Sequence, residues 1–142
     1  MLKGIPKEIS PELMHALMSM GHGDEIVLAD GNFPAASNAR LLVRTDWLDV
    51  CTILKAIMQF FPLDPFVDDH AVVMQVVDPE AEEPPIWSEF REILADAEDR
   101  EVELTQIERY AFYERSRKAF CVVATSEGAL YANLILKKGV VQ

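Results

Sequence analysis

Two short, almost continuously apolar runs constrain the fold of this chain more than any other feature. Residues 71–77 read Ala-Val-Val-Met-Gln-Val-Val, and residues 120–124 read Phe-Cys-Val-Val-Ala. Runs of this length that are rich in β-branched residues and lack polar alternation are typical of strands buried on both faces. Because such a sheet needs helices on each side, the two runs indicate an α/β arrangement.

Amphipathic helical segments alternate with these runs. Ser10 and Pro11 predict a helix start, since a hydroxyl caps the helix and proline is tolerated in the first turn. Gly21 is placed to end that helix. The other predicted helices span residues 47–59 (with Asp46 as N-cap), 86–97 and 112–118, and the other predicted strands span residues 25–29, 41–43, 103–108 and 133–136. The sequence thus predicts a single α/β domain over residues 1–142, with a central β-sheet and helices on both faces.

Charge and cysteine content limit the partners and the compartment. The net charge of -11, from 24 acidic and 13 basic residues, argues against nucleic acid and anionic membranes as partners. No apolar stretch reaches the roughly 20 residues that span a bilayer, and none resembles a secretory signal, so we expect a cytoplasmic protein. Cys51 and Cys121 lie in apolar surroundings and are interpreted as buried, reduced thiols, with a disulfide or a catalytic thiol as the alternatives.

Several common catalytic motifs are missing. The chain has no phosphate-binding Gly-x-x-x-x-Gly-Lys-Ser/Thr loop, no Gly-x-Gly-x-x-Gly fingerprint and no Gly-x-Ser-x-Gly elbow. The three histidines, His15, His22 and His70, do not pair at metal-ligand spacing. The sequence therefore predicts neither cofactor nor metal, which leaves direct acid–base chemistry or binding.

His22 is the candidate for acid–base chemistry. It lies between Gly21 and Gly23, in a loop where backbone can approach a ligand closely. Histidine can both give and take a proton near neutral pH. The alternative is an exposed loop histidine beside a helix end. We expect His15 and His70 to be surface residues.

Polar residues at strand and helix ends are candidates for ligand binding. Asp30 follows an apolar strand, where α/β sheets commonly place ligand groups, although it could simply cap its own turn. Tyr131 and Asn133 flank the start of the last strand. Alternation predicts that they point the same way, and a phenol with an amide suits hydroxyl recognition; the alternative is a strand-edge pair. Arg109 and Tyr113 belong to a dense charged and aromatic segment that helical charge pairs on a solvated face also explain.

Four segments together resemble the fucose mutarotase / ribose pyranase family. They are Met20-Gly-His-Gly-Asp-Glu-Ile26, Asp30-x-x-Phe-Pro-Ala35, Arg109-Tyr-Ala-Phe-Tyr-Glu-Arg115 and Tyr131-Ala-Asn-Leu-Ile-Leu-Lys-Lys-Gly-Val140. They occur in the family's order, and the similarity runs from near residue 5 to residue 140. The Phe-Tyr-Glu-Arg and Leu-Lys-Lys-Gly segments are closer to the fucose branch. Tyr110, where that branch usually has phenylalanine, and the acidic loop at residues 82–85 depart from the family pattern.

The resemblance implies an α/β fold, a monosaccharide pocket and a homo-oligomeric ring, with a pentamer and a decamer as the alternatives. It implies that His22 transfers protons, without cofactor or metal. It also implies that the sugar is bound by Asp30, Arg109, Tyr131 and Asn133, with Tyr113 lining the pocket. The sugar implied is L-fucose, with ribose or a related sugar as the alternative.

The implied reaction is the exchange of ring anomers. The ring opens when the ring oxygen gains a proton and the anomeric hydroxyl loses one, and the aldehyde then turns and recloses on its other face. Proton transfer by a positioned side chain contributes about 10²–10⁴-fold to such a reaction. Two other functions stay open from the residues: a monosaccharide-binding module without catalysis, and a structural protein whose ring surface is its function.

Overall fold

The computed structural model describes all residues, 1–142, and contains five helices and six strands. In chain order the elements are α1 (Pro11–Ser19), β1 (Glu25–Ala29), α2 (Ala35–Asn38), β2 (Leu42–Thr45), α3 (Val50–Ile57), β3 (Ala71–Met74), α4 (Pro85–Glu98), β4 (Thr105–Ile107), α5 (Arg109–Lys118), β5 (Cys121–Thr125) and β6 (Leu134–Lys137). The two apolar runs form β3 and β5, and every residue of both strands is buried.

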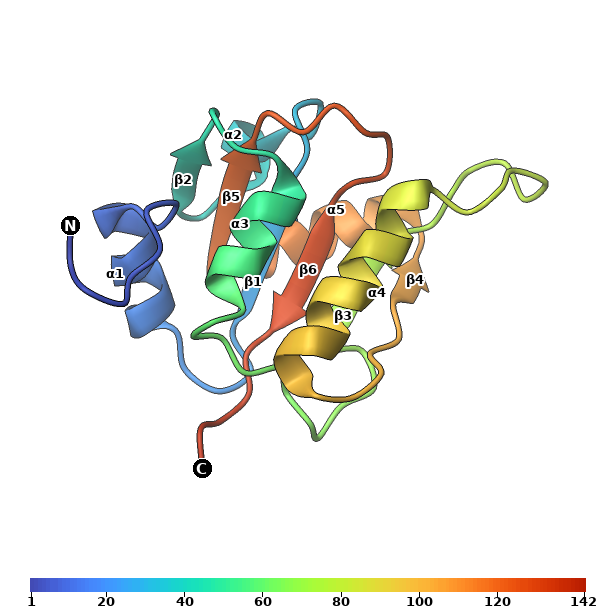
Figure 1. Ribbon diagram of the computed structural model, residues 1–142. Coiled ribbons are helices and arrows are strands. Elements are labelled where there is room, and N and C mark those ends of the chain that lie inside the picture. Colours follow the sequence, from blue (N-terminus) through green and yellow to red (C-terminus); the bar gives the residue numbers. More distant parts are fainter.

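All six strands form one mixed sheet in the order β2-β5-β1-β6-β3-β4. Only β6 is antiparallel to its neighbours, β1 and β3, and its arrow in Figure 1 points opposite to that of β5. The carboxyl ends of the other five strands therefore share one edge with the amino end of β6. We call this the carboxyl edge, and the opposite side the amino edge.

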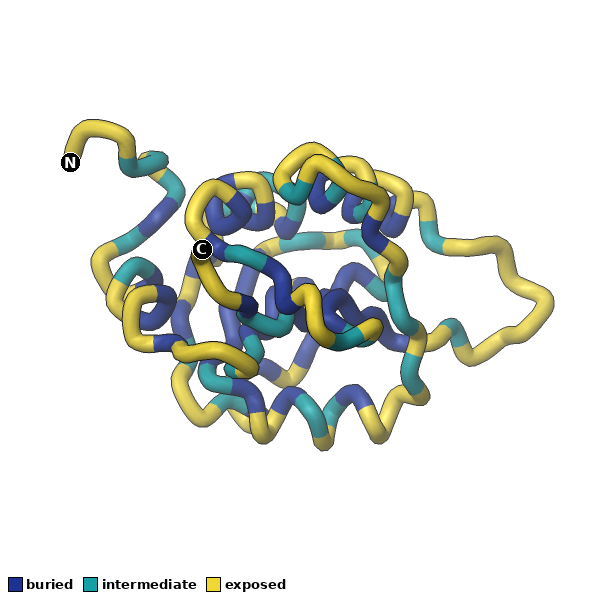
Figure 2. The backbone as a smooth tube through the Cα atoms, turned by 90° about the horizontal axis from the view of Figure 1, so that it is seen from below, coloured by how far each residue is buried: buried dark blue, intermediate teal, exposed yellow.

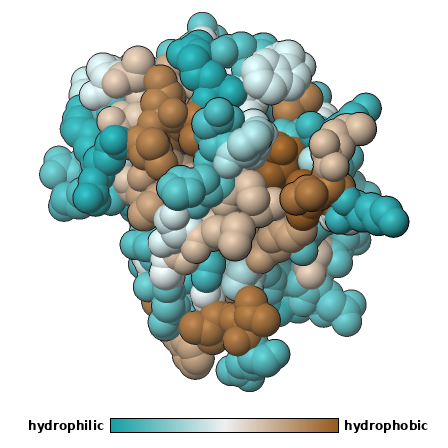
Figure 3. Space-filling view, turned by 90° about the vertical axis from the view of Figure 1, so that its left-hand side faces the viewer, coloured by the Kyte–Doolittle hydropathy of each residue, from teal (hydrophilic) through white to brown (hydrophobic).

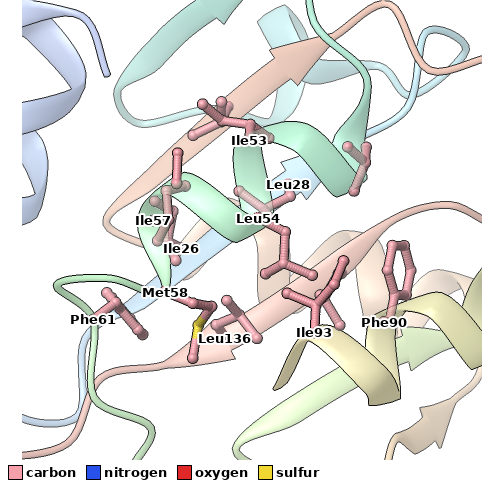
Figure 4. Close-up of a cluster of buried hydrophobic side chains, with 14 of the residues drawn as sticks. Ile26, Leu28, Ile53, Leu54, Ile57, Met58, Phe61, Phe90, Ile93 and Leu136 are labelled. Carbon is pink, nitrogen blue, oxygen red and sulfur yellow. The ribbon is translucent and has the colours of Figure 1, made fainter. Parts of the chain in front are cut away.

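Helices cover both faces of the sheet, as predicted. In β1, Ile26 and Leu28 face a core that α1, α3 and α4 complete, whereas Val27 and Ala29 face a smaller core beneath α2 and α5. Figure 1 shows α3 and α4 in front of the sheet and α5 behind it. Figure 4 shows how residues of α3 and α4 interdigitate over β1 and β6, and Figure 2 shows buried backbone concentrated in the middle of the molecule.

The start of α3 differs from the prediction. Asp49, not Asp46, is the N-cap, since its Oδ1 accepts a hydrogen bond from the Thr52 N–H at 2.7 Å. Asp46 instead pairs with Arg44 (Nη2 to Oδ1, 2.6 Å). Both aspartates lie within about one turn of the start of the apolar helical pattern, so local sequence could not distinguish them. As a result Trp47 lies outside the helix and is exposed.

Further predictions were wrong in detail. The α1 helix ends at Ser19 and is followed by Met20 in extended backbone, so Gly21 does not end it; Gly23 rather than Gly21 has a left-handed φ, of +86°. His70 is buried rather than exposed, with its Nδ1 2.8 Å from the Val67 carbonyl oxygen. His15 is exposed, as predicted.

Both cysteines are free; Cys121 is buried, whereas Cys51 is only half-buried. Burial raises the pKa of both thiols to about 12, with a smaller contribution from Glu89 at Cys51. Since the thiolate is the nucleophile, neither residue is suited to be a catalytic thiol.

Candidate functional site

Asp30 and Asn133 form a reciprocal pair at the carboxyl edge. The Asp30 N–H donates to Asn133 Oδ1 (2.8 Å), and Asn133 Nδ2 donates to Asp30 Oδ2 (2.9 Å). Because β1 and β6 are antiparallel neighbours, the residue after β1 lies beside the residue before β6. Both side chains are buried, so the sheet register holds a carboxylate at a defined position.

The Asp30 carboxylate has spare capacity as an acceptor. Its Oδ1 accepts one hydrogen bond, from the Asn32 N–H at 3.0 Å. Burial raises its pKa above the ordinary value, although the hydrogen bonds from Asn32 and Asn133 oppose this effect. A cavity of about 500 Å³ opens beside it. A carboxylate there can accept hydrogen bonds from ligand hydroxyls.

Arg109 and Tyr113 lie on the first turns of α5, at the same edge. Glu108 caps this helix by accepting the N–H groups of Tyr110 and Ala111, so the helix begins at Arg109 rather than at residue 112 as predicted. The Tyr113 ring packs at 5.6 Å, between centroids, from Phe33 in the turn after Asp30. Tyr113 is therefore adjacent to the Asp30 turn, and Arg109 lies one helical turn before it.

Tyr131 does not follow the predicted alternation with Asn133. Its φ is +57°, in the left-handed region, so the two residues are not on one extended strand. Its hydroxyl accepts the Val77 N–H at 3.3 Å, and its carbonyl oxygen accepts the Trp87 indole N–H at 2.9 Å. Tyr131 lines a different cavity from Asp30, one of about 750 Å³ that also includes Glu89.

His22 lies at the amino edge with a buried aspartate. Its Nε2 is 3.1 Å from Asp64 Oδ2, and its ring contacts Phe66 edge-on at 5.9 Å between centroids. The side chain of His22 is 48% exposed, whereas that of Asp64 is 5% exposed. The Phe66 N–H and His22 lower the pKa of Asp64, which favours a carboxylate beside the imidazole. The pair can orient the imidazole.

The structure thus divides the predicted residues between two edges. Asp30, Asn133, Tyr131, Arg109 and Tyr113 lie at the carboxyl edge, and His22 lies at the amino edge. At about 3.3 Å per residue, the five residues of β1 alone separate the edges by roughly 15 Å. One monosaccharide cannot contact His22 and Asp30 of the same chain.

Asp64 is the site residue that sequence reasoning missed. It lies between Pro62 and Pro65, where the pattern indicated only the end of a helix. Its backbone N–H donates to the Lys137 carbonyl oxygen at 3.0 Å, and Leu63 forms an isolated bridge with Lys138. The only local feature that could have drawn attention to Asp64 is its position between two prolines. The long-range pairing with the end of β6 is what brings Asp64 to His22.

Gly139 should prove essential to this pairing. A Cβ at position 139 would lie 2.5 Å from the Leu63 carbonyl oxygen and 2.9 Å from Asp64 Cα, both of them backbone atoms. Gly139→Ala should therefore displace Asp64 and lower the free energy of unfolding by about 1–3 kcal/mol. Chemical denaturation measures this loss. Gly128→Ala, with no atom near its Cβ, is the matched control, and equal stability of both variants would refute the close packing.

No group of three or more histidine, cysteine, aspartate or glutamate side chains is arranged to hold a metal ion. None of the helices has the length and apolar character required to cross a membrane.

The sequence profile of one protein family, described as the RbsD / FucU transport protein family, matches residues 3–141. The chain belongs to this RbsD/FucU family. Among its curated relatives in the family are the fucose mutarotases of Homo sapiens and Mus musculus, which are 50% and 49% identical to it. The alignments cover 98% and 97% of this chain, and 94% of each relative. The L-fucose mutarotase of Haemophilus influenzae is 41% identical, over 99% of this chain and 97% of its own.

Solved RbsD/FucU structures have the same fold. The fucose mutarotase of Streptococcus pneumoniae, crystallised in complex with L-fucose, superposes with a TM-score of 0.94 at 48% identity, over 99% of this chain and all of that one. RbsD of Bacillus subtilis, complexed with D-ribose, superposes with a TM-score of 0.73 at 19% identity, over the full length of both chains. The second similarity shows the shared fold alone.

Proposed function

We propose that this protein is a mutarotase that interconverts the α and β anomers of L-fucose. The observation that carries the proposal is the L-fucose complex of a protein with nearly the same backbone and 48% identity. The names of the curated relatives, at 41–50% identity over nearly the full chain, support the same activity. Geometry supports it as well, since a histidine–aspartate pair and a buried carboxylate suit proton transfer and hydroxyl binding.

His22 is the proposed proton carrier. Asp64 accepts the Nε2–H of His22, which leaves Nδ1 to exchange a proton with the sugar. Ring opening requires one proton delivered to the ring oxygen and one taken from the anomeric hydroxyl, and reclosure reverses both steps. An imidazole that both gives and takes protons meets these needs without electron transfer.

The residues of the carboxyl edge are proposed to hold the sugar. Asp30 would accept hydroxyl hydrogen bonds, and Arg109 would donate to ring or hydroxyl oxygens. The side-chain oxygen and one N–H of Asn133 already form hydrogen bonds with Asp30, so the main contribution of Asn133 is to orient that carboxylate. Tyr113 would line the pocket. Tyr131 lies at the same edge but lines a different cavity, so it would contact the sugar from that side.

We propose that each site forms between two subunits of a homo-oligomer. His22 and Asp30 lie at opposite edges, so a complete site needs the amino edge of one subunit against the carboxyl edge of the next. Large apolar side chains are exposed at both edges: Phe66 beside His22, and Trp47 and Leu130 at the other. Further hydrophobic patches lie on the side that carries α1, which is neither of these edges (Figure 3). A head-to-tail contact of this kind closes into a ring when the rotation permits.

Saturation-transfer NMR on equilibrated L-fucose tests the activity. The protein should raise the rate of α/β exchange above its spontaneous value. A protein that binds the sugar but leaves this rate unchanged would be a binding module, and the mutarotase proposal would fail. A panel that includes ribose would show which sugar is preferred.

Mixed oligomers should reveal whether the site is shared. His22→Ala and Asp30→Asn each damage a different half of the site, so co-expressed subunits should form some interfaces that combine an intact His22 with an intact Asp30. Random mixing gives about a quarter of such sites in a head-to-tail ring. Exchange activity should then exceed that of either variant alone. Activity no higher than the average of the two variants would indicate that sites are not shared.

A further inference from the structure

Arg109 is the arginine of the carboxyl edge that lacks a carboxylate partner. Its side chain contrasts with the arginines that form ion pairs: Arg44, Arg91, Arg100 and Arg115. The Arg109 side chain makes two contacts, both with Tyr110. Arg109 Nη2 donates to the Tyr110 hydroxyl at 2.8 Å, and its guanidinium carbon lies 4.8 Å from the centre of the Tyr110 ring.

Tyr110 is 65% exposed, and its ring has an aromatic neighbour. It contacts Tyr113 edge-on, with 6.4 Å between ring centres, and Tyr113 packs on Phe33. Phe33 follows Asp30 in the same turn and lines the cavity beside that carboxylate. A continuous row of aromatic rings therefore connects the Asp30 turn to the guanidinium of Arg109.

An exposed arginine ordinarily samples many rotamers, and binding a ligand must restrict them. At Arg109, one N–H is bonded to the Tyr110 hydroxyl and the planar group lies against the ring. Guanidinium has five N–H donors, so the others stay available to a ligand. The contact with Tyr110 thus orders the cation without consuming its binding capacity.

We propose that Tyr110 is a positioning residue that holds Arg109 ready to bind the oxygens of the sugar. This inference rests on the proposed mutarotase function. Tyr110 touches neither the sugar nor the proton that moves, and it acts through the hydrogen bond from Arg109. The substitution Tyr110→Phe removes this hydrogen bond and keeps the ring, so it isolates the effect.

Tyr110→Phe should raise KM for L-fucose about two- to tenfold, the range expected for one hydrogen bond, and leave kcat unchanged. In an Arg109→Ala background, which should itself raise KM, the same substitution should change nothing, because its target is gone. Exchange NMR at several sugar concentrations measures both constants. Lys118→Ala, at the far end of α5, is the control for the helix, and circular dichroism checks folding.

Other outcomes overturn the inference in distinguishable ways. If Tyr110→Phe raises KM equally in both backgrounds, Tyr110 binds the sugar directly. If it has no effect while Arg109→Ala raises KM, the arginine needs no positioning. If Arg109→Ala also has no effect, the proposed role of Arg109 is wrong, whereas wild-type exchange still stands as the separate test of mutarotase activity.

Discussion

Replacing His22 with alanine should slow anomer exchange by about 10²-fold or more, because the substitution removes the proposed proton carrier. Affinity for the sugar should change far less, since the carboxyl-edge residues that are proposed to bind hydroxyls remain. Exchange NMR gives the rate, and titration calorimetry gives the affinity of the folded variant.

Two controls separate proton transfer from structural damage. His15→Ala alters an exposed histidine of α1 and should leave the rate near the wild-type value. Asp64→Asn keeps the volume of the buried partner but removes its charge, and should give an intermediate rate. A folded His22→Ala protein with near wild-type exchange would mean that another group carries the proton.

Asp30→Asn should weaken sugar binding by about 1.5–3 kcal/mol through the loss of charge-assisted hydrogen bonds. This is roughly a ten- to 150-fold rise in the dissociation constant, measurable by titration calorimetry. The substitution also sets two donors against each other: in either orientation of the new amide, its NH₂ group faces Asn133 Nδ2 or the Asn32 N–H, which both donate to the carboxylate. The free energy of unfolding should therefore fall too.

A side-chain exchange distinguishes these two effects. In the double variant Asp30→Asn/Asn133→Asp, the new carboxylate can accept both the backbone N–H and the side-chain amide of residue 30. Stability should recover, whereas binding should not, because the charge has moved to the neighbouring strand. Full recovery of binding would show that the fold, and not the carboxylate at position 30, determines affinity.

The same carboxylate should give binding a pH dependence. Burial raises the pKa of Asp30 above its ordinary value of 3.8. Only the ionised form accepts hydroxyl hydrogen bonds at both oxygens, so affinity should fall as pH decreases through this raised pKa. The decrease should begin at a higher pH than for an unperturbed aspartate and should be absent in Asp30→Asn.

Sequence by itself determined the class of this fold. Strands that are buried on both faces can be recognised from sequence, because residues 71–74 and 121–125 do not alternate between apolar and polar side chains. The apolar pattern at residues 86–97 likewise identified α4 to within one residue at each end. Gly-His-Gly-Asp and Tyr-x-Asn also indicated which residues to examine, because their types suit proton transfer and hydroxyl binding.

Only the tertiary structure decided how these residues are arranged. The reversed direction of β6 is set by sheet pairing, which no local pattern encodes, and it brings Asn133 to Asp30 and the 63–64 segment to His22. Asp64 and the two-edge division were consequently invisible in the sequence. Local propensity specifies helices and strands residue by residue, whereas the register between distant strands depends on burying the whole core at once. That register places His22, the proposed proton carrier, and Asp30, the proposed sugar ligand, at opposite ends of one strand.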